Sequence, residues 1–382
     1  MPAVTRSLPS PEAEALLDLT RDLATAELAP RAASFEARAE FPREVFRTLG
    51  KAGLLGLPYP EEHGGGAQPY EVYLQVLEEL SRGWLAIGLG VSVHTLACFP
   101  LAQFGTDEQR ARWLPDMLGG ELLGSYCLSE PHSGSDAAAL STRAERDGEH
   151  YVVTGTKAWV THGGEADFYN LMVRTGGPGA KGVSCLLAPA DTPGLSAAAP
   201  EKKMGMRSSP TASVVLDAAR VPAERLLGAE GEGFRIAMAA LDGGRLGISA
   251  CAVGVAQAAL DLAVDYAKER KQFGSRIADF QGLSFLLADM ATHVEAARAL
   301  YLAAARRRDA GQPYGPQAAM AKLFCTDAAM RVTTDTVQVL GGAGYVEDFP
   351  AERYFREAKV MEIVEGTNQV QRMVIGRSLT AP

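Results

Sequence analysis

The sequence lacks the features of a secreted or metal-stabilised protein. Its five cysteines are odd in number, widely scattered and without a CxxC pair, which fits neither a disulfide framework nor a zinc site. The first residues, MPAVTRSLPSPEAEALL, lack the basic segment and apolar run of a secretory signal. We therefore expect a cytoplasmic protein with no bound metal. The cysteines are Cys98, Cys127, Cys185, Cys251 and Cys325.

Positive charge is also in deficit. Lys and Arg number 37 against 46 Asp and Glu, which gives a net charge of −9. An acidic chain without a long basic run is a poor candidate for binding nucleic acid or an anionic membrane. The apolar stretch 248–264 is interrupted by Gln257 and Asp261, so it is too short and too polar to span a bilayer. We expect neither nucleic acid nor a membrane as a partner.

No GxGxxG fingerprint follows a strand pattern, which argues against a Rossmann dinucleotide site. The texture of the chain changes twice. Helical spacing dominates residues 1–120, short β-branched and aromatic runs fill 121–232, and helical spacing returns in 233–382. We predict an α+β protein of three domains in this order. They are a helical domain, a small β-domain of sandwich or barrel type, and a bundle of unusually long helices.

The N-terminal region predicts a helix that begins after Ser10. The proline that follows suits a first helical turn, because it lacks an N–H that would be left unbonded there. Leu16, Leu19 and Leu23 recur at helical spacing. We expect these three leucines to share the buried face of the helix.

Two segments of the central region contain residues suited to binding a ligand. The loop CLSEPHSGSDAAA (127–139) combines hydroxyl donors with a glycine that permits close backbone approach. The run HYVVTGTKAWVTHGG (150–164) predicts a β-hairpin around Gly155 and places Trp159 beside Thr161. Taken singly, a polar loop and a structural tryptophan are the commoner explanations.

Three segments of the C-terminal region are also candidates. RKQFG (270–274) ends a long helix, and QVLGGAGY (338–345) has more glycines than a helix C-cap needs. In VEGTNQVQR (364–372), Thr367 is a plausible N-cap, and Glu365 stands just outside that helix. The Glu365 carboxylate could complement the helix dipole, or it could be a general base whose pKa is raised by burial.

Together these five segments resemble the acyl-CoA dehydrogenase family. Residues 127–139 are similar to the first family signature and residues 338–372 to the second, and the resemblance extends from about residue 15 to Arg377. It implies an FAD enzyme with an N-terminal helical domain, a central β-domain and a C-terminal four-helix bundle. It also implies a homotetramer, built as a dimer of dimers, that passes electrons to electron-transferring flavoprotein.

The resemblance assigns ligand contacts to residues in each region. Tyr126, Leu128 and Ser129 would line the flavin, with Trp159 and Thr161 flanking the isoalloxazine, and Thr367 and Gln369 would complete the cofactor site. Arg270, Phe273, Gln281, Gln338, Gly341 and Gly342 would reach the FAD of a neighbouring subunit. Ser135, Asp242 and Arg245 would contact CoA, although an ion pair on a helix is the structural alternative for the last two.

Oxidation of an acyl thioester between Cα and Cβ requires a base for the α-proton and an acceptor for the β-hydride. No side chain accepts hydride, so a flavin is needed. The resemblance makes Glu365 the base, with its backbone N–H on the thioester carbonyl. Some relatives place the base just before the arginine of the segment LDGGRLGI (241–248), where this chain has Gly244, which cannot serve.

The segment LDGGRLGI is similar to short-chain and short-branched-chain members, so we expect a short or branched acyl-CoA as substrate. A medium-chain or specialised-metabolism acyl thioester is the alternative. A flavin oxidase or monooxygenase that uses O2 on the same fold is not distinguished by the five segments. A non-catalytic binding protein is disfavoured because Glu365, Thr161, Arg270 and the GGAG run are all present.

Overall fold

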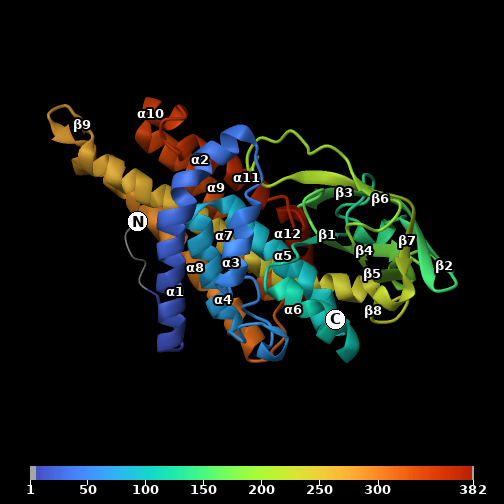
Figure 1. Cartoon of the computed structure of the whole chain (residues 1–382). Helices are drawn as coiled ribbons and strands as arrows, with labels where there is room; N and C mark the ends of the chain where they lie inside the picture. Colours follow the sequence, from blue (N-terminus) through green and yellow to red (C-terminus); the bar gives the residue numbers. More distant parts are fainter. Residues whose placement is uncertain (1–5, 381–382) are drawn as a thin grey trace.

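The computed structural model describes residues 6–380. The first five residues of the predicted N-terminal domain and the last two of the C-terminal domain lie outside this range. Figure 1 shows the N-terminal and C-terminal helices packed together, with the strands of the central region gathered beside them at the right. The order along the chain is helices, strands, helices, as the sequence predicts.

The first helix begins where the sequence places it, but its buried face differs from the prediction. The Ser10 hydroxyl accepts a hydrogen bond from the Ala13 N–H at 3.2 Å. Leu17 is 1% exposed and Leu19 45% exposed, so the predicted face through Leu19 is wrong. The core contacts follow Ala13, Leu17 and Thr20, while Leu16 lies at the edge of the face. The helices of this region are α1 (Pro11–Leu23), α2 (Ala29–Arg38), α3 (Arg43–Lys51), α4 (Tyr70–Gly83), α5 (Leu85–Phe104) and α6 (Asp107–Leu118), with a π-helical turn at Ala24–Leu28.

Within residues 6–380, two helices are long and apolar enough to cross a membrane by length and composition: α5 and α7 (Gly233–Glu269). Their most apolar windows are 89% and 83% buried inside the protein. A helix that is hydrophobic all round is expected in the core of a large protein. Burial therefore accounts for the composition of both helices.

The central region forms one sheet whose order is β6-β7-β3-β2-β4-β5-β8, with β1 parallel to β4. Tyr151, Tyr169, Leu186 and Leu216 come from four different strands yet share one buried cluster. The sheet therefore curves around a common core. The strands are β1 (Gly124–Cys127), β2 (Arg143–Asp147), β3 (His150–Thr161), β4 (Phe168–Arg174), β5 (Val183–Pro189), β6 (Leu195–Ala197), β7 (Thr211–Pro222) and β8 (Leu226–Leu227).

The hairpin predicted around Gly155 is wrong, because His150–Thr161 is a single strand, β3. Gly155 lies at a shift of register between β3 and β7, where β7 has one more residue than β3. A Cβ atom at this position would lie 2.5 Å from Thr142 Oγ1. The glycine thus permits close approach of β3 to a neighbouring segment and makes no turn.

The C-terminal region contains long helices that share a core with the N-terminal ones. α7, α8 and α9 pack against one another, α11 and α12 pack on α9, and α4 and α5 pack on α7. The elements are α8 (Gln281–Asp309), α9 (Gly315–Leu340), α10 (Gly342–Tyr345), α11 (Ala351–Met361) and α12 (Asn368–Thr380), with the short strands β9 (Lys271–Gln272) and β10 (Ser275–Arg276) between α7 and α8.

A buried charge network joins α4 to α8. The Arg298 guanidinium donates to Glu78 Oε1 at 2.9 Å, and Arg6 donates to the same oxygen at 2.9 Å. Tyr301 donates to the other carboxylate oxygen. Burial alone would raise the pKa of Glu78, but the two guanidinium groups outweigh it and lower that pKa to about 2. The carboxylate is therefore an anion at every ordinary pH.

Candidate active site

Glu365 lies in the short connection between α11 and α12. Its φ angle is +53°, and the next residue, Gly366, has φ +89°, so two consecutive residues are left-handed. Among residues 6–380, both carboxylate oxygens of Glu365 are buried without a hydrogen-bond partner, and its N–H has no acceptor. Burial raises the pKa of Glu365 to about 7, against the opposing charges of Arg245 and Lys322. A carboxylate with such a pKa is poised to take up a proton near neutral pH.

Gly244 on α7 makes room for this carboxylate. A Cβ atom built on Gly244 would lie 1.9 Å from Glu365 Oε2. Any side chain at position 244 would therefore displace the Glu365 carboxylate. The space at position 244 therefore does not hold a second side chain while the Glu365 carboxylate occupies it.

The neighbouring Arg245 is largely committed to an ion pair. Its Nη1 donates to Asp242 Oδ1 at 2.6 Å, and its Nε is buried without a partner among the residues described. Burial raises the pKa of Asp242, and Arg245 opposes that rise. The structure thus shows the ion pair that was the alternative to a CoA contact. Ser135, the third predicted CoA residue, is exposed in the loop before β2.

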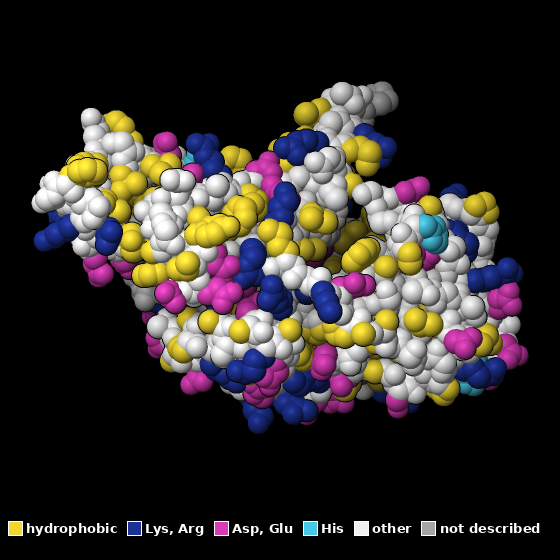
Figure 2. Space-filling view, turned by 90° about the horizontal axis from the view of Figure 1, so that it is seen from above, with side chains coloured by type: hydrophobic (Ala, Val, Ile, Leu, Met, Phe, Trp, Pro, Cys, Tyr) yellow, Lys and Arg dark blue, Asp and Glu magenta, His cyan; other side chains and the backbone are white. Residues whose placement is uncertain are grey.

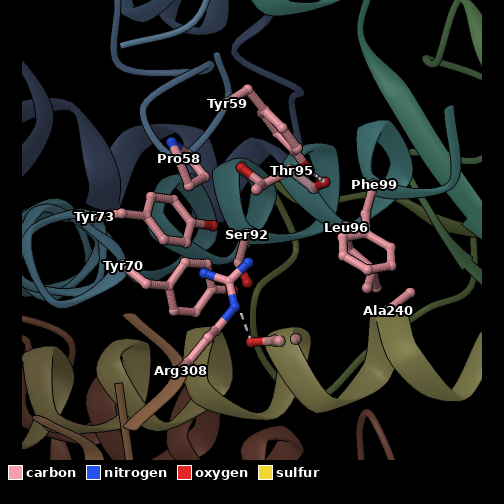
Figure 3. A pocket seen from close by; sticks show the side chains of 12 residues that line it. Pro58, Tyr59, Tyr70, Tyr73, Ser92, Thr95, Leu96, Phe99, Ala240 and Arg308 are labelled. Carbon is pink, nitrogen blue, oxygen red and sulfur yellow. Dashed lines mark hydrogen bonds between the residues drawn. The ribbon is translucent and has the colours of Figure 1, made fainter. Parts of the chain in front are cut away.

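A pocket with tyrosine-rich walls opens beside Gly244. Tyr70 and Tyr73 come from α4, Ser92 and Thr95 from α5, and Arg308 from the end of α8 (Figure 3). The Tyr70 hydroxyl donates to Gly243 O at 2.9 Å. The guanidinium carbon of Arg308 lies 3.5 Å from the centre of the Tyr70 ring, a cation–π contact. Pro58, Tyr59, Leu96, Phe99, Ala240 and Gly243 complete the lining.

A buried ion pair joins the first two candidate segments. Lys157 Nζ donates to Glu130 Oε1 at 2.8 Å and to Leu128 O at 3.2 Å. Burial alone would raise the pKa of Glu130, but Lys157 outweighs it and lowers that pKa to about 2. The Ala158 N–H also donates to Ser129 O at 2.9 Å. The loop that carries Ser129 is thereby fixed beside the strand that carries Trp159 and Thr161.

Three family models together match most of the chain. The acyl-CoA dehydrogenase N-terminal domain matches residues 10–121, the middle domain residues 125–219 and the C-terminal domain residues 231–380. The chain belongs to the acyl-CoA dehydrogenase family. The predicted fold class is confirmed: an N-terminal helical domain, a central β-sheet domain and a C-terminal helical domain. The boundaries at 120/121 and 232/233 stay a prediction.

Whole-chain relatives agree with the family models. The chain is 45% identical over 363 residues to an acyl-CoA dehydrogenase of Bacillus subtilis, covering 94% of this chain and 96% of that protein. It is 42% identical over 379 residues to the mitochondrial short-chain specific acyl-CoA dehydrogenase of Rattus norvegicus, covering 98% and 92%. The structure of butyryl-CoA dehydrogenase from Megasphaera elsdenii superposes with a TM-score of 0.96 at 38% identity, covering 98% and 100%. The activity of this enzyme is therefore acyl-CoA dehydrogenation.

The residues that the family resemblance assigns to the flavin ring of FAD could bind a planar ring. Trp159 is 66% exposed with φ +60°, at a second shift of register in β3, so most of its side chain is open to solvent. Leu128 is 9% exposed, and Ser129 and Thr161 are half-buried. Tyr126 donates to Ala237 O at 3.4 Å. An exposed aromatic face beside hydroxyl groups fits an aromatic heterocycle with polar edges.

The second set of predicted FAD residues lies elsewhere in the chain. Phe273 is 95% exposed with φ +51°, and Arg270, Gln281 and Gln338 are exposed as well. In Figure 1, β9 and α10 lie at the left of the helical region and β3 at the right. Figure 2, which shows the molecule from above, has more hydrophobic side chains over the helical part than over the β-domain. Within one chain, the structure does not bring the two sets together. Gly341 and Gly342 have open space where a Cβ atom would stand.

The last two predicted cofactor residues flank the Glu365 loop. The Thr367 hydroxyl accepts from the Val370 N–H at 3.3 Å, which confirms the predicted helix start, and Gln369 is exposed. Sequence reasoning missed Lys322 and Gln371, which bind the backbone of this loop, and Arg308 in the pocket. Lys322 had a signal, because it interrupts the apolar run AAMAKLF. All five cysteines are buried and free, and residues 6–380 hold no group of three or more metal-ligating side chains.

Proposed function

We propose that the enzyme oxidises a short or branched acyl-CoA between Cα and Cβ to the trans-2-enoyl-CoA, with Glu365 as the base. The observation that carries this proposal is the Glu365 carboxylate, buried without a partner against Gly244 at the edge of the pocket. A structural carboxylate in a protein interior is normally paired. One that is not paired, and whose pKa lies near 7, suits abstraction of a proton from a bound substrate.

The residues of the loop can perform the proton transfer in place. Glu365 takes the α-proton at one of its carboxylate oxygens, which lie beside Gly244 of α7. Its own N–H, which has no acceptor among residues 6–380, is free to donate to the thioester carbonyl and so makes the α-proton more acidic. The tyrosine-rich pocket excludes water from the acyl chain, which strengthens both interactions. When bound, FAD accepts the β-hydride.

The preference for a short acyl group is supported by the pocket and the relatives. The rings of Tyr59, Tyr70 and Tyr73 and the stacked Arg308 occupy space that a longer chain would need. Burying a hydrocarbon tail against a guanidinium group is unfavourable unless the group stays hydrated or paired. The similarity to a short-chain specific enzyme and to butyryl-CoA dehydrogenase points the same way.

We also propose that FAD is held between subunits of a homotetramer. Trp159, Thr161 and Ser129 would contact the ring system of one FAD, and Arg270 and Phe273 would hold the diphosphate and adenine side of a neighbour's FAD. The exposure of Phe273 supports this arrangement. An Arg270→Ala variant should lose FAD affinity, because a charge-assisted contact to the diphosphate is removed. Sedimentation that shows an FAD-replete monomer would contradict the shared site.

The electron acceptor and the cell compartment are expectations from the sequence. Electron-transferring flavoprotein is the proposed acceptor, and O2 is the alternative. Turnover measured by reduction of a dye or flavoprotein under anaerobic conditions, compared with oxygen uptake in air, separates the two. A cytoplasmic location stays a prediction, since the relatives include both bacterial and mitochondrial enzymes.

An anaerobic titration of the purified enzyme with a panel of acyl thioesters tests the proposed substrate. Butyryl-CoA and isobutyryl-CoA should bleach the flavin at one equivalent per subunit, whereas palmitoyl-CoA should not. The same acyl groups on an acyl carrier protein provide the control for the CoA moiety. Complete bleaching by long chains alone would contradict the short-chain assignment.

A further inference from the structure

Two buried side chains hold the backbone on which Glu365 stands. Lys322 on α9 is fully buried, and its Nζ donates to Gly366 O at 3.0 Å and to Asn368 Oδ1 at 2.8 Å. Gln371 on α12 is also fully buried, and its Nε2 donates to Gly366 O at 2.8 Å and to Glu365 O at 3.2 Å. The Gly366 carbonyl is therefore bound from two helices, α9 and α12, and the Glu365 carbonyl is bound from α12.

This loop needs such support because its conformation is unfavourable. Glu365 has φ +53°, a backbone conformation that residues other than glycine adopt uncommonly and that the surrounding structure must stabilise. A Cβ atom at Gly366 would lie 2.8 Å from Gln371 Nε2, so the glycine permits the approach of that amide. The direction of the Glu365 carboxylate follows from this backbone, and the carboxylate itself has no hydrogen bond to fix it.

Lys322 also brings a positive charge to the base. Burial lowers the pKa of Lys322 to about 8, and Glu365 is the first of the groups that oppose this shift. The groups around the pair come from several elements. Besides Glu365, the charged groups that affect the pKa of Lys322 are Glu362, Asp327 and Arg245. The pKa of Glu365 is affected by Arg245 and Lys322. Glu365 in turn contributes to the raised pKa values of Tyr70, Tyr73, Tyr126 and Cys251.

We propose that Lys322 and Gln371 are positioning residues that direct the Glu365 carboxylate toward the substrate by holding the backbone of its loop. The proposal rests on the proposed role of Glu365. A purely structural role, in which Lys322 only ties α9 to α12 through Asn368, is the alternative to be tested.

Three variants separate these roles. Lys322→Met has nearly the same shape and removes the charge together with the hydrogen bonds to Gly366 and Asn368. Gln371→Leu removes the hydrogen bonds to the two loop carbonyls and leaves the charge. Thr326→Val is the control, because Thr326 exchanges hydrogen bonds with Asn368 between α9 and α12 and touches neither loop carbonyl.

The readouts are the anaerobic rate of flavin reduction across pH and the hydrogen–deuterium exchange of the peptide that spans residues 362–368. A misplaced base costs on the order of 10²-fold in rate, so we expect roughly that loss in Lys322→Met and a somewhat smaller loss in Gln371→Leu. Both variants should exchange the loop amides faster than the Thr326→Val control. Only Lys322→Met should move the apparent pKa of the base, and it should move it upward by about one unit.

The outcomes decide between the roles. Equal rates, pH profiles and exchange in Lys322→Met and Thr326→Val would overturn the proposal and leave Lys322 as a tie between helices. If Lys322→Met does not fold, hydrogen–deuterium exchange of the loop in Gln371→Leu decides. Exchange faster than in Thr326→Val supports the positioning role, and exchange at the same rate contradicts it. Wild-type enzyme that no acyl-CoA reduces would contradict the proposed function instead, while the exchange data would still test the positioning of the loop.

Discussion

Replacing Glu365 by glutamine should remove proton abstraction while leaving the packing around this side chain nearly unchanged. The amide has nearly the shape of the carboxylate but cannot take the α-proton. Loss of a general base typically costs about 10²–10⁴-fold, and we expect a larger loss of flavin reduction, by several orders of magnitude, because position 244 offers no second carboxylate. FAD content and acyl-CoA binding should stay near those of the wild type. Stopped-flow absorbance under anaerobic conditions measures the rate, and rapid bleaching in Glu365→Gln would refute the assignment.

The same variant should change how stability depends on pH. The folded-state pKa of Glu365 is raised from 4.5 to about 7, so the native state binds the proton more tightly than the unfolded chain. Stability from this group is fully present below pH 4.5 and is lost as pH rises through 7. At about 1.4 kcal/mol per unit, the loss amounts to roughly 3 kcal/mol. Glu365→Gln lacks this loss, so its stability relative to the wild type should rise by about that amount between pH 4.5 and 8. A difference that is flat across this range, measured by unfolding in urea, would show that the carboxylate is not held in a desolvated site.

Other variants test single features of the structure. Gly244→Glu alone should abolish activity, because its side chain displaces the Glu365 carboxylate, whereas Gly244→Glu combined with Glu365→Gly should recover part of the rate of flavin reduction. Gly342→Val should keep the helical circular dichroism signal, since the chain leaves open space there, and should lose FAD; unchanged FAD affinity would make the GGAG run a simple helix end. Glu78→Ala should destabilise the protein by up to about 3–5 kcal/mol in chemical denaturation, because two buried guanidinium groups lose a shared carboxylate and keep only those of Glu79 and Glu295; a change below 1 kcal/mol would mean that these remaining partners suffice.

The candidate base and the glycine opposite it could be predicted from the sequence. The carboxylate before a glycine and a helix N-cap is visible in the chain itself, and the resemblance to the family points to Gly244 as the position where some relatives carry the base. The helix–strand–helix order could be predicted too, because the apolar spacing typical of helices or of strands persists over many residues in each region. Leu17 and Leu19 show the limit: three leucines at helical spacing define a face, but the tertiary contacts of α1 choose the adjacent one.

Features that depend on contacts between distant segments could not be read in this way. Gly155 is of a residue type common in turns, yet it lies inside β3, beside a shift of register with β7 and against Thr142. Lys322 lies 44 residues before Gly366 in the chain, and a lysine in an apolar helix face says only that some acceptor must be near. The tyrosines and Arg308 of the pocket come from α4, the loop before it and the end of α8, which the fold alone brings together.

The rate of flavin bleaching with butyryl-CoA deuterated at Cα tests most directly whether Glu365 removes the α-proton of a short acyl thioester. Under anaerobic conditions, wild-type enzyme should bleach with one equivalent of substrate per subunit and release the trans-2-enoyl-CoA. Deuteration should slow the bleaching several-fold, and the rate should rise with pH through an apparent pKa near 7. Bleaching that is insensitive to α-deuteration and to pH between 6 and 8, or no bleaching by any acyl-CoA, would contradict this account.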